Sequence, residues 1–252
     1  MEFTDVTRAR DMMGIVDLGV LFIHGLSASP ASLKDWMEAI NGNLNVSVRA
    51  PLLPGHGKTW EALSKVRWQD WEQEVLAAYD TLAREHPKVA VCGMSMGGTL
   101  ACLVAARRKP VAMVLMNHLM WLDQPLFLAP LLRRLTTSLA PIAGDIKKPG
   151  VVEPAYDRLP TASIDEMRKL MKVVQPLLPG ITIPTLIFKS REDHVIPAIS
   201  ATRTMDQLGS TQKELVWLDN SYHVATLDYD GPLIIERSAQ FLWNFRRKPP
   251  QG

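Results

Sequence analysis

The sequence predicts an α/β fold, in which one mainly parallel sheet carries helices on both of its faces. Short, almost entirely apolar runs, which suit strands buried on both sides, alternate with segments of helical length. The chain has 252 residues, of which 47% are hydrophobic and 21% are charged. A chain of this size and composition can bury a substantial core, and it fits one large domain or two small ones. These proportions exclude a disordered or low-complexity protein.

Local signals support each predicted element. The apolar runs predict strands over residues 18–24, 46–50, 89–94, 111–116, 184–190 and 213–218. Helices are predicted over residues 32–40, 68–86, 97–108, 196–208 and 233–245. Ser29 followed by Pro30 is typical of a helix start, and Asn41-Gly42 predicts the end of that first helix. In the second helix, apolar residues recur at helical spacing until Pro87 ends it.

Residues 119–178 interrupt this alternation. The segment contains many prolines and several leucine and methionine clusters but no clean strand, which indicates an insertion over the sheet. We therefore expect residues 1–118 and 179–252 to form the core and residues 119–178 to form a small cap. The dense apolar residues of this segment fit ordinary packing as well as the lining of a pocket for an acyl chain; they are Met120, Trp121, Leu126, Phe127, Leu128, Leu131 and Leu132.

Charge and cysteine usage exclude several classes of protein. Lys+Arg number 28 and Asp+Glu 26, a formal net charge of +2, so we expect no nucleic-acid partner. Cys92 and Cys102 lie in apolar surroundings, which favours buried reduced thiols over a disulfide framework. The first residues lack the apolar core of a signal peptide, and no stretch approaches the ~20 apolar residues of a membrane span. We expect a soluble, cytoplasmic protein.

The motif GMSMG at residues 93–97 is the sharpest chemical signal. It follows a predicted strand and begins a helix of small residues, which is the context of a nucleophile elbow. Glycines fit both ends of such a turn because it is too tight for side chains. The turn predicts Ser95 as an exposed nucleophile whose reacting centre faces the amino end of a helix. The same five-residue pattern can also arise by chance.

A serine nucleophile needs a base, and an elbow of this kind takes its acid and then its histidine from later strands. Asp193 follows the strand predicted over residues 184–190, and His223 follows the strand predicted over residues 213–218. These two residues are therefore the predicted acid and base. Glu192 and Asp219 are competing acids that fit a solvated loop and a turn, and His194 comes too early in the order to be the base.

Acyl transfer also requires backbone N–H donors for the oxyanion. The residue after the nucleophile, Met96, supplies one candidate, and Leu26 in the motif HGL supplies the other. A plain turn is the alternative interpretation of HGL. The remaining histidines His56, His86 and His118 are expected to be surface or loop residues. None has the spacing of a metal ligand with another His or Cys, so we expect no metal.

The ordered motifs HGLSASP, PLLPGHG, GMSMGG, REDHVIP and NSYHVATLDYD resemble those of the α/β-hydrolase superfamily. HVATLDYD and the insertion motif DIKKPGVVEPAYDRLP are similar, more narrowly, to those of small bacterial monoacylglycerol lipases and related carboxylesterases. The resemblance extends over nearly the whole chain except the first fourteen residues. It implies an α/β-hydrolase fold with a cap, a triad of Ser95, Asp193 and His223, and an oxyanion hole formed by Leu26 and Met96.

The resemblance further implies a serine hydrolase that cleaves monoacylglycerols to fatty acid and glycerol without a cofactor. In such enzymes an acidic cap residue recognises the glycerol hydroxyls, a role that falls on Glu153, and Ile142 would line the same end of the pocket. A surface glutamate is the alternative interpretation of Glu153. The partner would be a small lipid ester, and an apolar outer face of the cap could touch a membrane or micelle transiently.

Two other functions stay open. The first is a general carboxylesterase or thioesterase acting on short- to medium-chain acyl esters, which would differ in the pocket and share the triad. The second is a non-catalytic binding member of the fold, because a fold alone does not establish activity. Dehalogenase and epoxide-hydrolase chemistry normally needs an aspartate at the elbow, where this sequence has Ser95.

Overall fold

The computed structural model describes residues 9–14, 17–122, 134–141 and 144–246. Its centre is a seven-stranded sheet with the order β1-β3-β2-β4-β5-β8-β9. All neighbouring strands are parallel except β1, which pairs antiparallel with β3 at one edge. The strands are β1 (Arg10–Met12), β2 (Leu18–Ile23), β3 (Ser47–Ala50), β4 (Lys88–Met94), β5 (Ala112–Met116), β8 (Thr185–Ser190) and β9 (Lys213–Leu218). The predicted mainly parallel sheet is confirmed.

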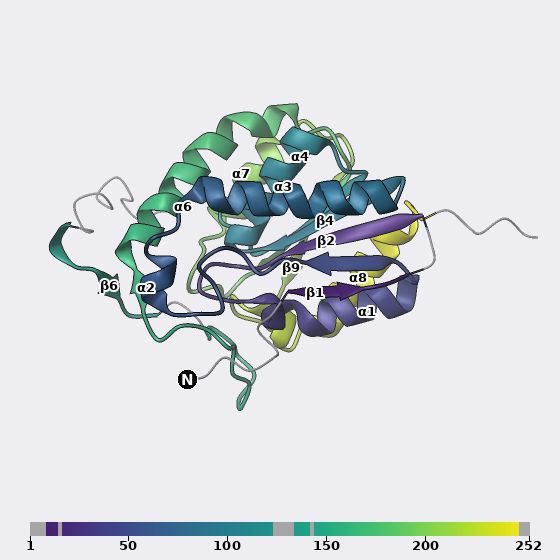
Figure 1. Ribbon diagram of the computed structural model, residues 1–252. Helices are drawn as coiled ribbons and strands as arrows, with labels where there is room; N and C mark the ends of the chain where they lie inside the picture. The colour runs from purple at the N-terminus through teal and green to yellow at the C-terminus, as the bar shows by residue number, and fades with distance from the viewer. Residues whose placement is uncertain (1–8, 15–16, 123–133, 142–143, 247–252) are drawn as a thin grey trace, which may run out of the picture.

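Helices cover both faces of the sheet. In Figure 1, α3, α4, α6 and α7 lie on one side of the strands, and α1 and α8 lie on the other. The helices are α1 (Lys34–Leu44), α2 (Trp60–Leu63), α3 (Trp68–Glu85), α4 (Met96–Arg108), α6 (Thr161–Val174), α7 (Ile199–Gln207) and α8 (Gly231–Trp243). This layering is why the strands are apolar on both faces.

The side chains of β2 show how one strand serves two cores. Leu21 and Ile23 belong to the apolar cluster beneath α3 and α4, whereas Val20 and Phe22 belong to the cluster beneath α1 and α8. Successive side chains of a strand point to opposite faces, so each apolar run supplies both clusters. Phe22 packs edge-on against Trp36 of α1, with ring centroids 5.0 Å apart.

Three local predictions were wrong or incomplete. Helix α1 continues through Asn41-Gly42 and ends at Leu44, because Asn45 supplies the left-handed residue (φ 53°) that closes the helix. Gly42 lies inside the helix, where an added Cβ would meet nothing. The edge strand β1 and the helices α2 and α6 were not predicted from the sequence. Strand β1 and helix α2 are too short for a periodic signal, with three and four residues, whereas the 14-residue α6 lies in the segment that was expected to form an insertion.

The described part of residues 119–178 contains a small hairpin and a long helix. Strand β6 (Ser138–Leu139) pairs antiparallel with β7 (Leu159–Pro160), so two short strands lie where none was expected. Helix α6 follows, and the 3₁₀ helix η4 (Gln175–Gly180) returns the chain to the sheet. Met167, Leu170 and Val174 of α6 are buried in the same apolar cluster as α3 and α4.

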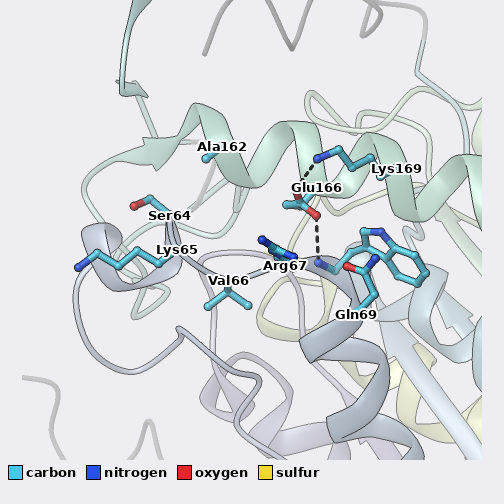
Figure 2. Close-up of a pocket in the computed structure, with 9 residues that line it drawn as sticks. Ser64, Lys65, Val66, Arg67, Gln69, Ala162, Glu166 and Lys169 are labelled. Atoms are coloured by element: carbon cyan, nitrogen blue, oxygen red, sulfur yellow. Dashed lines mark hydrogen bonds and ion pairs between the residues drawn. The ribbon is translucent and has the colours of Figure 1, made fainter. Parts of the chain in front are cut away.

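A buried carboxylate fixes α6 to the start of α3. Glu166 accepts the backbone N–H of Trp68 at 3.1 Å and the Lys169 ammonium at 2.6 Å. Figure 2 shows this contact beside a polar cavity of about 580 Å³ between α6 and the turn that joins α2 to α3. None of the residues predicted for the active site lines this cavity.

Both cysteines are buried free thiols, as predicted. Burial raises the pKa of the Cys102 thiol to about 12 and raises that of Cys92 as well, so both stay protonated and unreactive. Within the described residues, no helix is both long and apolar enough to cross a membrane.

Candidate active site

Ser95 occupies a strained turn between β4 and α4. Its backbone has φ 55° and ψ −123°, a conformation that costs a non-glycine residue of order 1–3 kcal/mol. A Cβ on Gly93 would lie 2.2 Å from the carbonyl oxygen of Gly97, and a Cβ on Gly97 would lie 2.0 Å from that of Ile23. The two glycines of the motif are therefore required by the backbone itself. The turn leaves the Ser95 side chain facing a pocket.

Asp193 and His223 meet at the same edge of the sheet. His223 Nδ1 lies 3.1 Å from both carboxylate oxygens of Asp193, and both side chains are nearly inaccessible to solvent. Because the partner is a carboxylate, we assign the proton to Nδ1, which leaves Nε2 free to act as a base. Backbone N–H groups of Val195 and Ile196 bind Asp193 Oδ1 at 2.9 and 2.8 Å and fix its orientation.

Several contacts keep Asp193 ionised. Burial on its own would raise the pKa of this carboxyl group. The neighbouring His223 and Lys189 and the Ile196 N–H oppose burial, and they hold the pKa of Asp193 well below its ordinary value. Asp193 is therefore a carboxylate throughout the pH range in which an imidazole acts as a base.

Ser95 and His223 line one small pocket together with Leu26 and Glu153. Ser95 and Leu26 also line a larger adjoining cavity of about 490 Å³. The larger cavity is walled mainly by apolar side chains, including Leu119, Leu122, Leu139, Leu159, Ile164, Met167, Val195 and Ile196. Ser95 thus lies where a small pocket with a carboxylate meets a larger apolar one.

The backbone around Ser95 also offers donors for an oxyanion. Leu26 follows β2 and lines both cavities, and Met96 is the first residue of α4. Neither backbone N–H has a protein acceptor among the residues that the structure describes. A Cβ on Gly25 would lie 3.2 Å from Ser95 Cβ, so the loop after β2 runs directly beside the serine.

Two neutral histidines form hydrogen bonds that hold the loop after β2 in place. His24 Nε2 accepts the N–H of Leu53 at 3.1 Å, and His56 Nε2 accepts the N–H of Ser27 at 3.2 Å. Burial lowers the pKa of His56 to about 4 and holds that of His24 well below its ordinary value, so both rings can accept these bonds at neutral pH. His56 and His118 lie in loops, as expected, but they are buried rather than exposed.

Asp145 and Asp228 connect the insertion to the loop that carries His223. Asp145 Oδ2 accepts the backbone N–H of His223 at 3.1 Å, and its carbonyl accepts the N–H of Val224 at 3.0 Å. Asp228 accepts backbone N–H groups from both segments, including Lys147 at 2.6 Å and Tyr222 at 3.0 Å. Neither aspartate was predicted as a site residue, although Asp145 lies in the motif DIKKPGVVEPAYDRLP and Asp228 in the motif NSYHVATLDYD.

A buried asparagine connects the ends of β5 and β8 to the loop that carries His223. Asn117, at the end of β5, donates to Ser190 Oγ at 2.9 Å and to the carbonyl of His223 at 2.8 Å. Its side-chain oxygen accepts the Ser190 N–H at 2.8 Å. The carboxyl ends of β5 and β8 and the histidine loop are thereby held in one arrangement.

The competing residues have other partners. Glu192 is exposed and pairs with Lys147, and Asp219 is exposed and pairs with Arg191. His194 pairs with Asp145 at 2.8 Å, and this carboxylate raises the pKa of His194. Across the described ranges, no group of three or more His, Cys, Asp or Glu side chains could hold a metal ion.

Glu153 reaches the pocket from the insertion. Its side chain is buried and accepts the Ser32 hydroxyl at 2.7 Å and the N–H of Gly144 at 3.1 Å. It lines the same pocket as Ser95, so a surface position is ruled out. Ile142, the other residue predicted for this end, lies outside the described residues.

A doubly wound parallel sheet with a serine elbow after one strand, and an acid and a histidine after the last two, defines the α/β-hydrolase fold. The sequence profile of the family described as Serine aminopeptidase, S33 matches residues 16–230. A thermostable monoacylglycerol lipase of Bacillus sp. (strain H-257) is 38% identical over 226 residues, 89% of this chain and 90% of that protein. The chain belongs to this hydrolase family, and the predicted resemblance is confirmed.

Two further proteins are similar to this chain over most of its length. A carboxylesterase of Bacillus subtilis (strain 168) is 25% identical over 90% of this chain and 92% of its own length. A solved structure from work on LipS and LipT, two metagenome-derived lipolytic enzymes, superposes with a TM-score of 0.91 and 34% identity. That alignment covers 95% of this chain and 98% of the other.

Proposed function

We propose that this protein is a carboxylic ester hydrolase that cleaves monoacylglycerols to fatty acid and glycerol. One observation carries the proposal: Ser95 borders both a small pocket with the Glu153 carboxylate and a larger apolar cavity. A monoacylglycerol has the same division, with a diol at one end of its ester and a hydrocarbon chain at the other. The 38% identical relative is a monoacylglycerol lipase, which supports the same substrate.

The first half of the reaction acylates the enzyme. His223 Nε2 takes the Ser95 hydroxyl proton while the Ser95 oxygen attacks the ester carbonyl carbon. The N–H groups of Leu26 and Met96 stabilise the resulting oxyanion, and losing one such donor typically costs about 10²–10³ in kcat. His223 then gives its proton to the glycerol oxygen as the bond to the carbonyl carbon breaks, which leaves the fatty acyl group on Ser95.

The second half regenerates the serine. Water gives a proton to His223 and attacks the acyl carbon, and the returning proton releases the Ser95 oxygen and the fatty acid. Asp193 keeps the His223 ring in the required tautomer and stabilises its protonated form in both halves. Apart from the ester and water, every group in this cycle comes from the chain itself, so the reaction needs no cofactor.

The insertion has two roles in this proposal. The described part of residues 119–178 acts as a cap on the described core of residues 1–118 and 179–252, and it supplies Glu153 as well as much of the acyl wall, including Leu122, Leu159 and Ile164. Each buried CH₂ of the acyl chain contributes about 0.8 kcal/mol. Leu135, Leu139 and Val152 are exposed apolar residues of the same cap, and through them the cap touches the micelle or membrane that holds the substrate.

A substrate panel tests the proposal against the alternative, a general carboxylesterase, which the Bacillus subtilis relative favours. Purified protein is given monoacylglycerols with chains of about 8 to 16 carbons and short-chain nitrophenyl esters, and kcat/KM is measured for each. We expect the monoacylglycerols to be hydrolysed and kcat/KM to rise with chain length until the cavity is filled. Good turnover of the short esters without monoacylglycerol hydrolysis would establish the carboxylesterase instead.

Glu153→Gln tests the glycerol end of the pocket. The amide keeps the size of the side chain but loses the charge that would bind hydroxyl groups, so kcat/KM for monoacylglycerols should fall about 10- to 100-fold. Hydrolysis of short nitrophenyl esters, which have no glycerol, should change less than about threefold. Glu153→Ala, which also loses the contacts to Ser32 and Gly144, is the harsher companion variant. Equal losses on both substrates would remove Glu153 from glycerol recognition.

A further inference from the structure

A buried lysine contacts the predicted catalytic acid. Lys189 lies on β8, and its side chain is only 1% exposed. Its Nζ donates to Asp193 Oδ2 at 2.5 Å and to the carbonyl of Ile196 at 2.7 Å. Fully buried lysines are rare because desolvation disfavours the charge, and here desolvation lowers the pKa of Lys189 while Asp193 opposes the effect.

The two oxygens of the Asp193 carboxylate bind different donors. Oδ1 receives the backbone N–H groups of Val195 and Ile196, and Oδ2 receives Lys189. Both oxygens lie 3.1 Å from His223 Nδ1. The acid next to His223 is therefore half of a buried ion pair, and the pair places a weaker negative potential on the imidazole than an unpaired carboxylate would.

We propose that Lys189 is a positioning residue that fixes the rotamer of Asp193 and, by offsetting its charge, keeps His223 in its unprotonated, base-competent form to lower pH. The inference rests on the proposed function, because it takes Asp193 and His223 as partners of Ser95. Lys189 itself touches neither Ser95 nor either cavity.

Other charged groups around these residues do not replace Lys189. Asp145 accepts the backbone N–H of His223 and pairs with His194, and Glu153 lines the same pocket, so both carboxylates favour a protonated imidazole. On the other side of Lys189, burial lowers the pKa of His118 to about 3, so that ring is neutral. Among the residues that the structure describes, Lys189 is thus the fixed cation in contact with the acid.

The test is the pH dependence of Ser95 reactivity in Lys189→Met. Methionine keeps the length and apolar stem of lysine, and Asp193 retains its bonds from Val195, Ile196 and His223. The rate of labelling by a fluorophosphonate is measured from about pH 5 to 9, since attack on the probe requires unprotonated His223. Without the cation, the carboxylate favours the protonated ring, so the acid limb should move to higher pH by roughly one unit.

Two further variants separate this role from simple loss of packing. Thr204→Val removes the buried bond between Thr204 and His118, at 2.7 Å, without touching Asp193, and it should leave the acid limb in place even if Tm falls. Lys189→Arg retains the charge and should keep the wild-type limb even if misplacement lowers the rate. An acid limb in Lys189→Met within about 0.2 pH units of wild type would overturn the proposal.

The two proposals fail in different ways. Wild-type labelling that follows an acid limb, together with no hydrolysis of monoacylglycerols, would contradict the proposed substrate and leave the role of Lys189 measurable. Wild-type protein that does not react with the fluorophosphonate at any pH would contradict the triad, and with it both proposals.

Discussion

Ser95→Ala is expected to lower kcat for ester hydrolysis by about 10⁴–10⁶, because no other described serine or threonine lines either of the two cavities that border Ser95. The variant keeps the Cβ, and therefore the same strained backbone at φ 55°. The remaining rate would come from the N–H groups of Leu26 and Met96 and from substrate binding alone. Initial rates on a monoacylglycerol and on a nitrophenyl ester measure the loss.

Non-additivity provides a sharper form of this prediction. If Ser95 and His223 act as one unit, His223→Ala alone should cost nearly as much as Ser95→Ala, and the double variant should cost no more than either. Losses that multiply would mean that the two residues work separately, which contradicts the mechanism.

Ser95→Gly controls for folding. Glycine adopts positive φ without a steric penalty, so this variant should lose activity as completely as Ser95→Ala and yet unfold at a free energy about 1 kcal/mol higher. Urea denaturation followed by far-UV circular dichroism measures the difference. A destabilised Ser95→Gly would show that the turn is not strained in the folded protein.

The sheet and the elbow could be predicted because their signals are local. Apolar runs mark the strands, and the Gly-x-Ser-x-Gly pattern is forced by close backbone contacts, because a Cβ added to Gly93 or Gly97 would lie only 2.0–2.2 Å from a carbonyl oxygen. Asp193 and His223 could be predicted from the order of the strands, because the carboxyl ends of parallel strands share one edge of the sheet. These parts of the site therefore depend on neighbours along the chain or on topology.

The site residues that were not predicted form hydrogen bonds with residues far away along the sequence. Asp145 binds the N–H of a residue 78 positions later, and Asn117 reaches the His223 carbonyl across 106 positions. No local pattern distinguishes such polar residues from exposed ones. Lys189 did carry a signal: it is a charged residue within the apolar run TLIFKS, four positions before the predicted acid. A lysine in a buried strand needs a buried partner, and Asp193 is within reach.

Asp193→Asn should lower kcat by about 10³–10⁴, because an amide cannot hold the imidazole in the reactive tautomer or stabilise its charged form. The backbone donors of Val195 and Ile196 will hold the amide oxygen at the Oδ1 position. The NH₂ group then occupies the Oδ2 position and faces the Lys189 ammonium, where two donors oppose each other. The same substitution that impairs catalysis therefore leaves a buried cation unpaired.

This second consequence predicts a loss of stability as well as of activity. Removing one partner of a buried ion pair costs about 3–5 kcal/mol, which urea denaturation at pH 8 should detect. Asp193→Asn combined with Lys189→Met removes both charges, so it should recover most of the stability and none of the activity. Recovery of activity in the double variant would mean that the ion pair, and not the orientation of His223, is what Asp193 contributes.

Acidification tests the same ion pair in the unmodified protein. The folded-state pKa of Asp193 is held below its unfolded value of about 3.9, so its contribution to stability is complete well above that pH. As the pH falls below about 4, the unfolded chain binds a proton that the folded protein resists, and the free energy of unfolding declines. The stability difference between wild type and Asp193→Asn should therefore be constant from about pH 6 to 8 and shrink below pH 4. A difference that persists unchanged at pH 3 would show that Asp193 is not held as a carboxylate in the folded protein.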